Sequence, residues 1–495
     1  MSTSSPTRPF YQRIYSNVWY LFVGNTLANV AMFVSNMLIA RTLGVEDFGI
    51  VSFLLGIVNV TIVAIDFGLS TAATKRIAEE RGRGSNDIKL RTLIRSFQRT
   101  ICLTGIAGAV ACGCLVAFAP LSLLEGFKIA DSWLLGLWVL VPTITKGIIA
   151  VFNGFEDMRF TLIGLLMLEP LKLAMLLVLL FSGAMTLQAL FLIWGWTLLF
   201  ALIIIVLIGR RFLDKRVGTI PSRPWRFSDI TGRLHESIAY LMPFIGITIM
   251  PGLVALILGI VSTKTEIAWF AASASLASMS FLVLEPVAKT LLSAFTHRFA
   301  RSGQAIAPSE GAQLLRMLSL VNVCVLLGYL LFGSLIIRWT YGGEFELAIS
   351  VVMILAAVNF FESFRLGVDP LLFSINAVSM VSRIELVRYA IMLPFIIGLG
   401  WRYGALGAAI GALLASMVCN VIRMYVLQTR LDIPGMEFAL RFVVLVGAVL
   451  AGWQLGVSPL GVASAALLLG RGLGLYRLAD LQVVLRIVPS LLRFR

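Results

Sequence analysis

Residues 16–40 read SNVWYLFVGNTLANVAMFVSNMLIA, and residues 47–72 read DFGIVSFLLGIVNVTIVAIDFGLSTA. The first run contains no charged residue, and the second contains only Asp47 and Asp66. A helix needs roughly 20 consecutive apolar residues to cross a hydrocarbon core of about 30 Å. Each run is long enough for this, so the pattern predicts an integral membrane protein.

Apolar runs of spanning length recur along the chain and predict an all-α polytopic membrane protein of about fourteen transmembrane helices. Hydrophobic residues make up 59% of the sequence and charged residues only 13%, whereas a soluble domain carries about 25% charged residues. The remaining expected spans are 97–119, 132–152, 161–182, 186–208, 238–259, 268–293, 313–337, 346–371, 378–400, 404–427, 438–456 and 457–474. Only Gly456–Pro459 separates the last two, so twelve spans are the alternative to fourteen.

The basic residues predict the orientation of these helices. Of the 40 Lys and Arg residues, 29 lie in the segments on the N-terminal side of the membrane and 5 in the opposite loops. Cytoplasmic loops carry the excess of positive charge. We therefore expect a multi-pass protein of the cytoplasmic (cell inner) membrane with both termini inside. The net charge of +15 is explained by this bias, and nucleic-acid binding is not expected.

The two halves of the chain align with each other at an offset of about 219 residues, which matches helices 1–6 with helices 7–12. This offset places Asp66 on Glu285, Lys146 on Arg365 and Glu169 on Arg388. Six spans per repeat give both halves the same orientation, an arrangement typical of transporters with a cavity between their halves. The predicted domains are an N-lobe (1–208), a cytoplasmic linker (209–237), a C-lobe (238–428), and two final helices with an amphipathic basic tail (429–495).

Several ionisable residues fall inside the expected spans, where a charge costs roughly 2.5–3.5 kcal/mol and usually faces the protein interior. Acid and base recur three or four residues apart, on one helical face, at Glu169/Lys172, Glu285/Lys289, Glu362/Arg365, Arg365/Asp369 and Glu385/Arg388. They form structural ion pairs or line a cationic cavity for an anionic substrate. Charges near helix ends, such as Lys172, Glu385 and Arg423, can also reach the interface.

Lys146 is the strongest candidate for a substrate-binding cation, because no carboxylate lies three or four residues from it. Arg365, its repeat mate, comes second and Arg388 third. An arginine fork suits phosphate or pyrophosphate, and lysine acts as a point charge.

Two further groups of polar residues are candidates. Asn25 and Asn29 give the first helix a polar face, which either lines the cavity or forms interhelical hydrogen bonds. Asp66 and Glu285 are candidates for coupling to a cation gradient, although a structural role is favoured for Asp66. The sequence has no recognisable enzyme motif and no metal-ligand spacing among its five cysteines and two histidines, so we expect no catalytic residues, metal or cofactor.

The segment NTLANVAMFVSNMLIARTLGVEDFGIVSFLLGIVNVTIVAIDFGLSTAATKRIAEERGR (25–83) resembles the polysaccharide transporter family, the Wzx-like O-antigen flippases of the multidrug/oligosaccharidyl-lipid/polysaccharide exporter superfamily. The matching pieces are ARTLG (40–44), FG (48–49), DFGL (66–69) and the later VFNGFEDMRF (151–160). The resemblance implies two six-helix lobes arranged as a V around a central cavity.

It also implies alternating access and transport of a polyprenyl-pyrophosphate-linked oligosaccharide for surface or exopolysaccharide synthesis. Membrane lipids, and polysaccharide polymerase and assembly proteins, are then the expected partners. A drug/cation antiporter of the same superfamily is the main alternative. A membrane glycosyltransferase or polymerase is a weaker one, because it would need a large external loop bearing catalytic acids.

Overall fold

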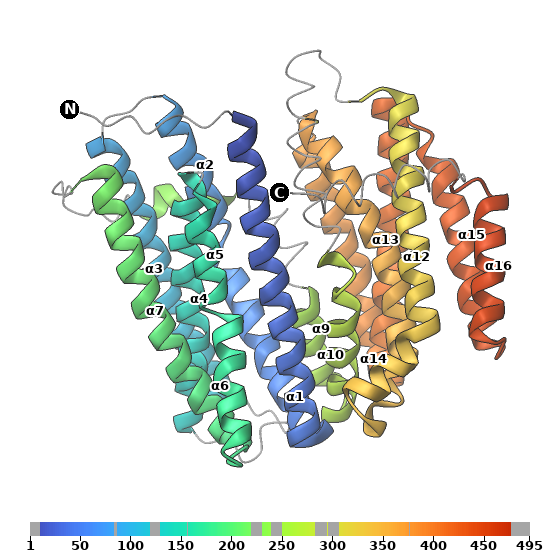
Figure 1. The fold of residues 1–495 in the computed structure, drawn as a ribbon, viewed down its shortest axis with the longest axis horizontal. Helices are drawn as coiled ribbons and strands as arrows, with labels where there is room; N and C mark the ends of the chain where they lie inside the picture. Colours follow the sequence, from blue (N-terminus) through green and yellow to red (C-terminus); the bar gives the residue numbers. More distant parts are fainter. Residues whose placement is uncertain are drawn as a thin grey trace. The chain divides into compact units, whose positions relative to one another are not determined.

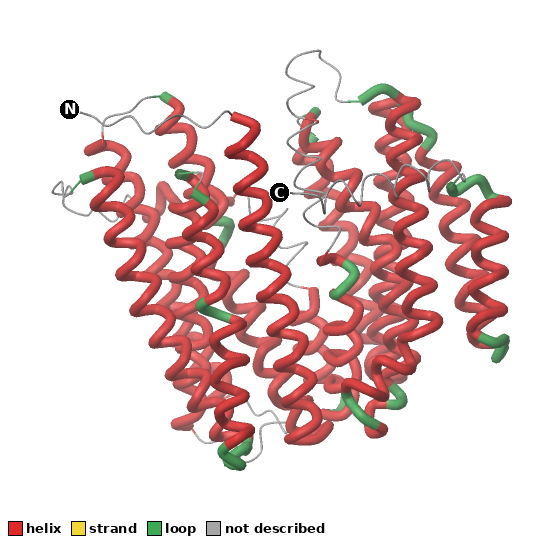
Figure 2. Tube along the Cα trace, in the orientation of Figure 1, coloured by secondary structure: helices red, strands yellow, loops and turns green. Residues whose placement is uncertain are grey.

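A computed structural model describes residues 10–83, 87–118, 129–155, 157–218, 230–238, 250–282, 295, 306–375 and 377–476. This part of the chain consists of helices and short loops, and no strand occurs in it (Figure 2). Nine of its helices are long and apolar enough to cross a membrane. The all-α, multi-pass membrane fold expected from the sequence is confirmed, whereas the number of spans stays a prediction.

The chain divides into two compact units, Met1–Leu256 and Ile257–Arg495. The division falls inside a short helix, α9 (Met250–Val261), downstream of the predicted linker 209–237. The helices of the first unit (Figure 1) are α1 (Phe10–Asp66), α2 (Leu69–Gly82), α3 (Asp87–Phe118), α4 (Ile129–Gly154), α5 (Met158–Leu166), α6 (Glu169–Phe181) and α7 (Leu187–Val217). The predicted tail after residue 476 lies outside the described residues.

Helices α1 and α2 show how two predicted spans are joined and where the second one breaks. Helix α1 continues from the first predicted span into the second, but Gly44, which has φ 83° and ψ 177°, kinks the helix between them. Phe67 and Gly68 then adopt left-handed conformations, with φ of 49° and 77°. The second predicted span therefore stops at Asp66, and α2 begins at Leu69.

The predicted span 161–182 is also divided. It contains the end of α5 and all of α6, which are separated at Met167 and Leu168. Pro170 lies in the first turn of α6, where the ring's missing N–H costs no helical hydrogen bond. At one point α3 and α4 lie close together, because a Cβ on Gly136 of α4 would lie 3.1 Å from the Ala109 carbonyl oxygen of α3. Such small residues allow two membrane helices to approach closely.

The second unit (Figure 1) is built around α13. Its other helices are α10 (Lys264–Ser278), α12 (Pro308–Thr340), α14 (Val378–Leu431), α15 (Gly435–Gln454) and α16 (Pro459–Gly472), and a 3₁₀ turn, η2 (Gly343–Phe345), precedes α13 (Ala348–Ser374). Nearly every residue of α13 is buried. Phe364 of α13 stacks on Phe442 of α15 with ring centroids 4.1 Å apart. This helix therefore brings its polar residues into the centre of the unit.

Helix α14 contains the two predicted spans 378–400 and 404–427. Gly404 has φ 56° and ψ −134°, and it kinks the helix between them. The backbone N–H of Ala405 donates to Oε2 of Glu266, on α10, at 2.7 Å. The kink turns the second half of α14 so that residues from both halves face α13. Glu385 of the first half and Arg423 of the second half therefore meet in one cluster.

Candidate functional site

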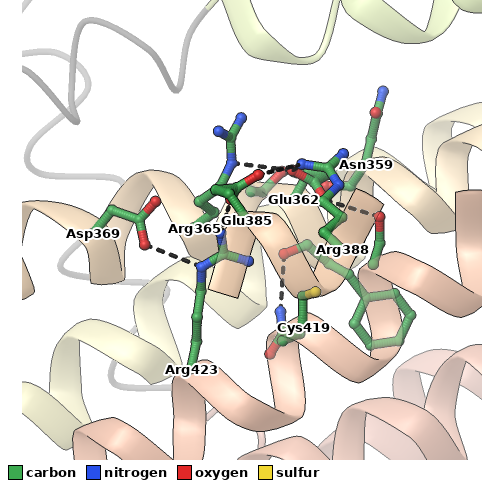
Figure 3. A network of polar contacts seen from close by, with 12 residues as sticks. Asn359, Glu362, Arg365, Asp369, Glu385, Arg388, Cys419 and Arg423 are labelled. Carbon is green, nitrogen blue, oxygen red and sulfur yellow. Dashed lines mark hydrogen bonds and ion pairs between the residues drawn. The ribbon is translucent and has the colours of Figure 1, made fainter. Parts of the chain in front are cut away.

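A network of buried charges occupies the core of the second unit (Figure 3). Three helical segments supply it, namely α13, the first half of α14 and the second half of α14. Its members, which we call the core charge network, are Glu362, Arg365, Asp369, Glu385, Arg388 and Arg423. Each of these side chains is buried. Spacings of three or four residues place the charges of each segment on one helical face.

Glu362 is the centre of one half of the network. Its Oε2 lies 3.0 Å from Nε of Arg365 and 3.1 Å from Nη1 of Arg388. Its Oε1 accepts a hydrogen bond from the hydroxyl of Ser416 at 2.8 Å. Both carboxylate oxygens therefore have donors, as a charge removed from water requires.

Arg423 holds the other half together. Its Nε donates to Oδ1 of Asp369 at 3.0 Å, and its Nη2 pairs with Oε1 of Glu385. Glu385 in turn lies 3.4 Å from Nη1 of Arg388, which links the two halves. Three arginines therefore face three carboxylates, and the formal charge of the cluster is zero. This balance compensates the charges that are buried among the apolar helices of the unit.

The sequence predicted part of this network. The pairs Glu362/Arg365 and Glu385/Arg388 were expected from their spacing, and both are ion pairs in the structure. The expected Arg365/Asp369 pair is not, because Asp369 binds Arg423 from α14. Arg423 is only 2% exposed, so it does not reach out to the interface as its position near a helix end suggested. The packing of the helices places Arg423 against Asp369 and Glu385. Residue spacing along a single helix cannot predict such contacts.

The first unit holds a second buried charge site. Asp66 is fully buried at the end of α1, and its Oδ1 accepts a hydrogen bond from the Ser70 hydroxyl at 2.5 Å. Lys146 of α4 attracts Asp66 electrostatically. The sequence argument for Lys146 rested on the lack of a carboxylate three or four residues away along the chain. The structure shows that tertiary packing supplies one from a helix 80 positions earlier in the chain.

The other predicted site residues are distributed differently. Asn25 and Asn29 are half-buried on α1 and do not belong to the core charge network. Glu285 lies outside the described residues. Lys172 forms the expected pair with Glu169 at 2.7 Å. The structure therefore brings Arg365 and Arg388 to the same carboxylate, and it places Lys146 within electrostatic range of Asp66. The binding and coupling roles of all these residues stay predictions.

Within the described residues, no group of three or more His, Cys, Asp or Glu is placed to bind a metal. The carboxylates of the core charge network face arginines, which would repel a cation. The arginines present N–H donors of the kind that bind phosphate. The arrangement is suited to exchange of ionic partners, in which an anionic ligand takes the place of a carboxylate beside an arginine.

Comparison with known proteins identifies the family of the chain. The profile described as "polysaccharide biosynthesis protein" matches residues 14–297, more than half of the sequence. The chain belongs to this family. A relative, the probable low-salt glycan biosynthesis flippase Agl15 of Haloferax volcanii, is 21% identical over 454 residues, which cover 89% of each protein. The resemblance to glycan flippases is thus confirmed.

Solved structures show that the chain shares its fold with two transporters. A multidrug transporter of the MATE family in its inward-facing conformation matches with a TM-score of 0.66 and 12% identity, over 81% of this chain and 95% of its own. The lipid II flippase MurJ matches with a TM-score of 0.64 and 12% identity, over 96% of this chain and 100% of its own. These matches confirm the expected superfamily fold and, with the family match, a transporter and not an enzyme.

Proposed function

We propose that this protein translocates a polyprenyl-pyrophosphate-linked oligosaccharide across the cytoplasmic membrane, for surface or exopolysaccharide synthesis. The observation that carries the proposal is the core charge network, which keeps three arginines ionised at membrane depth. Desolvated arginines bind diphosphate through paired N–H donors. Family membership and the names of the glycan flippase and lipid II flippase relatives support this substrate class.

The proposed mechanism is alternating access between two six-helix lobes, residues 1–208 and 238–428, joined by the linker 209–237. Substrate diphosphate would bind at Lys146, Arg365 and Arg388, and the carboxylates beside them would lose a cationic partner. When the substrate leaves, each carboxylate recovers its cation. Asp66 and Lys146, and Glu362 and Arg388, are the pairs in which we expect this exchange. Asn25 and Asn29 would contact the glycan, and Asp66 and Glu285 would couple transport to a cation gradient.

Complementation of a strain that lacks the endogenous flippase tests this proposal. The double variant Lys146→Ala/Arg365→Ala should reduce glycan export more than tenfold at a normal level of protein in the membrane. The variant Arg338→Ala is the matched control, because Arg338 forms an exposed ion pair with Glu346. Export that persists unchanged in the double variant would show that these cations do not bind the substrate.

Drug efflux is the alternative, because the MATE transporter shares the fold. The family match favours glycan transport over it. A drug transporter would raise resistance to cationic dyes in a sensitive host without restoring glycan export. We expect the reverse result, restored export with unchanged dye resistance.

A further inference from the structure

A pocket of the first unit shares no lining residue with the two buried charge sites. It is about 520 Å³ in volume and opens at the ends of the helices, where α2 ends and α3 begins. Residues 230–238, a helical segment at the end of the predicted linker, form its third wall. The residues that line it are Arg76, Glu80, Ile88, Lys89, Thr92, Leu93, Arg233 and Glu236. Pockets of this volume are large enough for a small ligand.

Positive charge is in excess around this pocket. One carboxylate, Glu236, serves two arginines, with Arg233 Nη1 at 2.8 Å and Arg76 Nη2 at 3.3 Å. Glu80 is likewise shared by Lys89 at 2.9 Å and Arg83 at 3.7 Å. Three cations, Arg76, Lys89 and Arg233, and two carboxylates, Glu80 and Glu236, line the pocket, which leaves one positive charge in excess.

The cations of the pocket combine a fixed group with accessible ones. Arg233 is held in place, because its Nε donates to the Ser96 hydroxyl at 3.3 Å and its guanidinium lies 4.9 Å from the centre of the Phe97 ring. The side chains of Arg76 and Lys89 are 43% and 65% exposed, so a ligand can reach them. A fixed arginine beside accessible cations provides several N–H donors for the oxygens of one phosphate.

The rim of the pocket is apolar on one side. Ile88 is 50% exposed and Leu93 is half-buried, and both lie in the first two turns of α3. Residues 100–118 of α3 contain no charged residue and form the apolar part of this helix. The pocket therefore lies about two helical turns before this charge-free stretch, close to where α3 is expected to leave the membrane, and aliphatic side chains line it beside its cations.

We propose that this pocket binds the phosphate of an anionic phospholipid headgroup at the membrane–water interface. The arginines and Lys89 contact the phosphate oxygens, and Ile88 and Leu93 contact the glycerol and the first methylenes of the acyl chains. Basic pockets between helices at the membrane surface suit such headgroups. Because Glu236 holds both arginines, the bound phosphate competes with this carboxylate. The site shares no residue with the proposed transport site, so either proposal can fail without the other.

Lipid binding to the full-length protein in neutral detergent tests the proposal. Native mass spectrometry would measure the affinity for a short-chain phosphatidylglycerol, with phosphatidylcholine of the same chain length as the uncharged comparison. Phosphatidylglycerol should bind at least tenfold more tightly than phosphatidylcholine. The variant Arg76→Gln/Arg233→Gln should bind phosphatidylglycerol about 30-fold more weakly, since each interfacial cation contributes about fivefold.

A second variant changes affinity in the opposite direction and therefore separates binding from loss of folding. Glu236→Gln removes the competing carboxylate and should tighten phosphatidylglycerol binding about fivefold. Arg338→Gln, at an exposed ion pair of the second unit, should leave it unchanged. Equal affinities of the wild type and Arg76→Gln/Arg233→Gln, or weaker binding by Glu236→Gln, would overturn the proposal. Inorganic diphosphate that binds as tightly as the lipid would overturn the lipid as the source of the phosphate.

Discussion

Glu362 illustrates, at the scale of a single residue, how a charge is retained in the core of a membrane protein. It accepts from Ser416 and pairs with Arg365 and Arg388, so neither of its oxygens lacks a donor. A buried ion pair contributes little net stability relative to apolar residues, but removing one partner leaves the other uncompensated. The network is therefore more sensitive to loss of one member than its zero net charge suggests.

We expect Glu362→Gln to destabilise the protein by about 3–5 kcal/mol, because Arg365 and Arg388 lose their shared carboxylate. The free energy of unfolding of the purified protein in detergent measures this effect. Glu437→Gln is the matched control, since Glu437 pairs with Arg441 one helical turn away and is 66% exposed. We expect its cost to stay near 0.5 kcal/mol. Equal costs for the two variants would contradict the central role of Glu362.

Asp66 and Lys146 should be energetically coupled. In a double-mutant cycle of Asp66→Asn and Lys146→Met, we expect an interaction energy of about 0.5–3 kcal/mol in the free energy of unfolding, because the two charges attract each other in a buried environment. The same cycle with Lys215→Met, an exposed residue in the last turn of α7, provides the comparison and should be additive. An additive result for the Asp66/Lys146 cycle would show that the two do not stabilise each other.

At the scale of secondary structure elements, breaks and kinks determine where polar groups meet. The break after α1 places Asp66 at a helix end, and the kink of α14 brings Arg423 into a cluster with Glu385. Non-helical backbone is tolerated at membrane depth only where protein or water satisfies its polar groups. The Ala405 N–H, which follows the kink, is satisfied by Glu266.

Gly404→Ala tests the kink of α14. Gly404 has a positive φ of 56°, and a Cβ there would collide with the Glu266 carboxyl group. We expect the variant to lose about 1–3 kcal/mol of stability. Gly398→Ala in the same helix is the control, because a Cβ at Gly398 would meet no neighbour within 4 Å. It should be neutral or slightly stabilising in thermal unfolding. A stable Gly404→Ala protein would mean that the kink does not require glycine.

At the scale of the whole molecule, the chain is a multi-pass membrane protein of the polysaccharide biosynthesis family with a transporter fold. Among the described residues, the first compact unit contains the Asp66/Lys146 site and the second contains the core charge network. Their members Lys146 and Arg365 occupy matched positions of the internal repeat that we predict from the sequence. This correspondence agrees with the proposal that both halves contribute cations to the transport of an anionic substrate.

The orientation of the molecule is a prediction at this scale. Reporters fused to either end should both lie in the cytoplasm, because 29 of the 40 basic residues belong to that side. Green fluorescent protein should fluoresce at both positions, and alkaline phosphatase should be inactive there. Alkaline phosphatase fused after Lys264, in a loop expected outside, should be active. An active phosphatase at the C-terminus would mean an odd number of spans.

Apolar run length and helical periodicity are local properties, and the sequence alone was enough to predict what depends on them. These features are the all-helical membrane fold, the positions of most helices, and the pairs Glu362/Arg365, Glu385/Arg388 and Glu169/Lys172. In each pair the partners lie three residues apart on one helix, so helix geometry alone brings them together. The family resemblance was also visible in the glycine-rich motifs of residues 25–83.

Other features depend on contacts between helices, and only the tertiary structure decided them. Arg423 binds Asp369 and Glu385 across helices, and Asp66 approaches Lys146 from a different helix. The left-handed conformations at Phe67 and Gly68 end the second predicted span at Asp66, before its predicted limit at residue 72. A charge buried among membrane helices needs an opposite charge close to it. Helix packing can supply that charge from a residue far away in the sequence. The sequence therefore showed which residues needed partners, and the packing of the helices determined which partners they obtained.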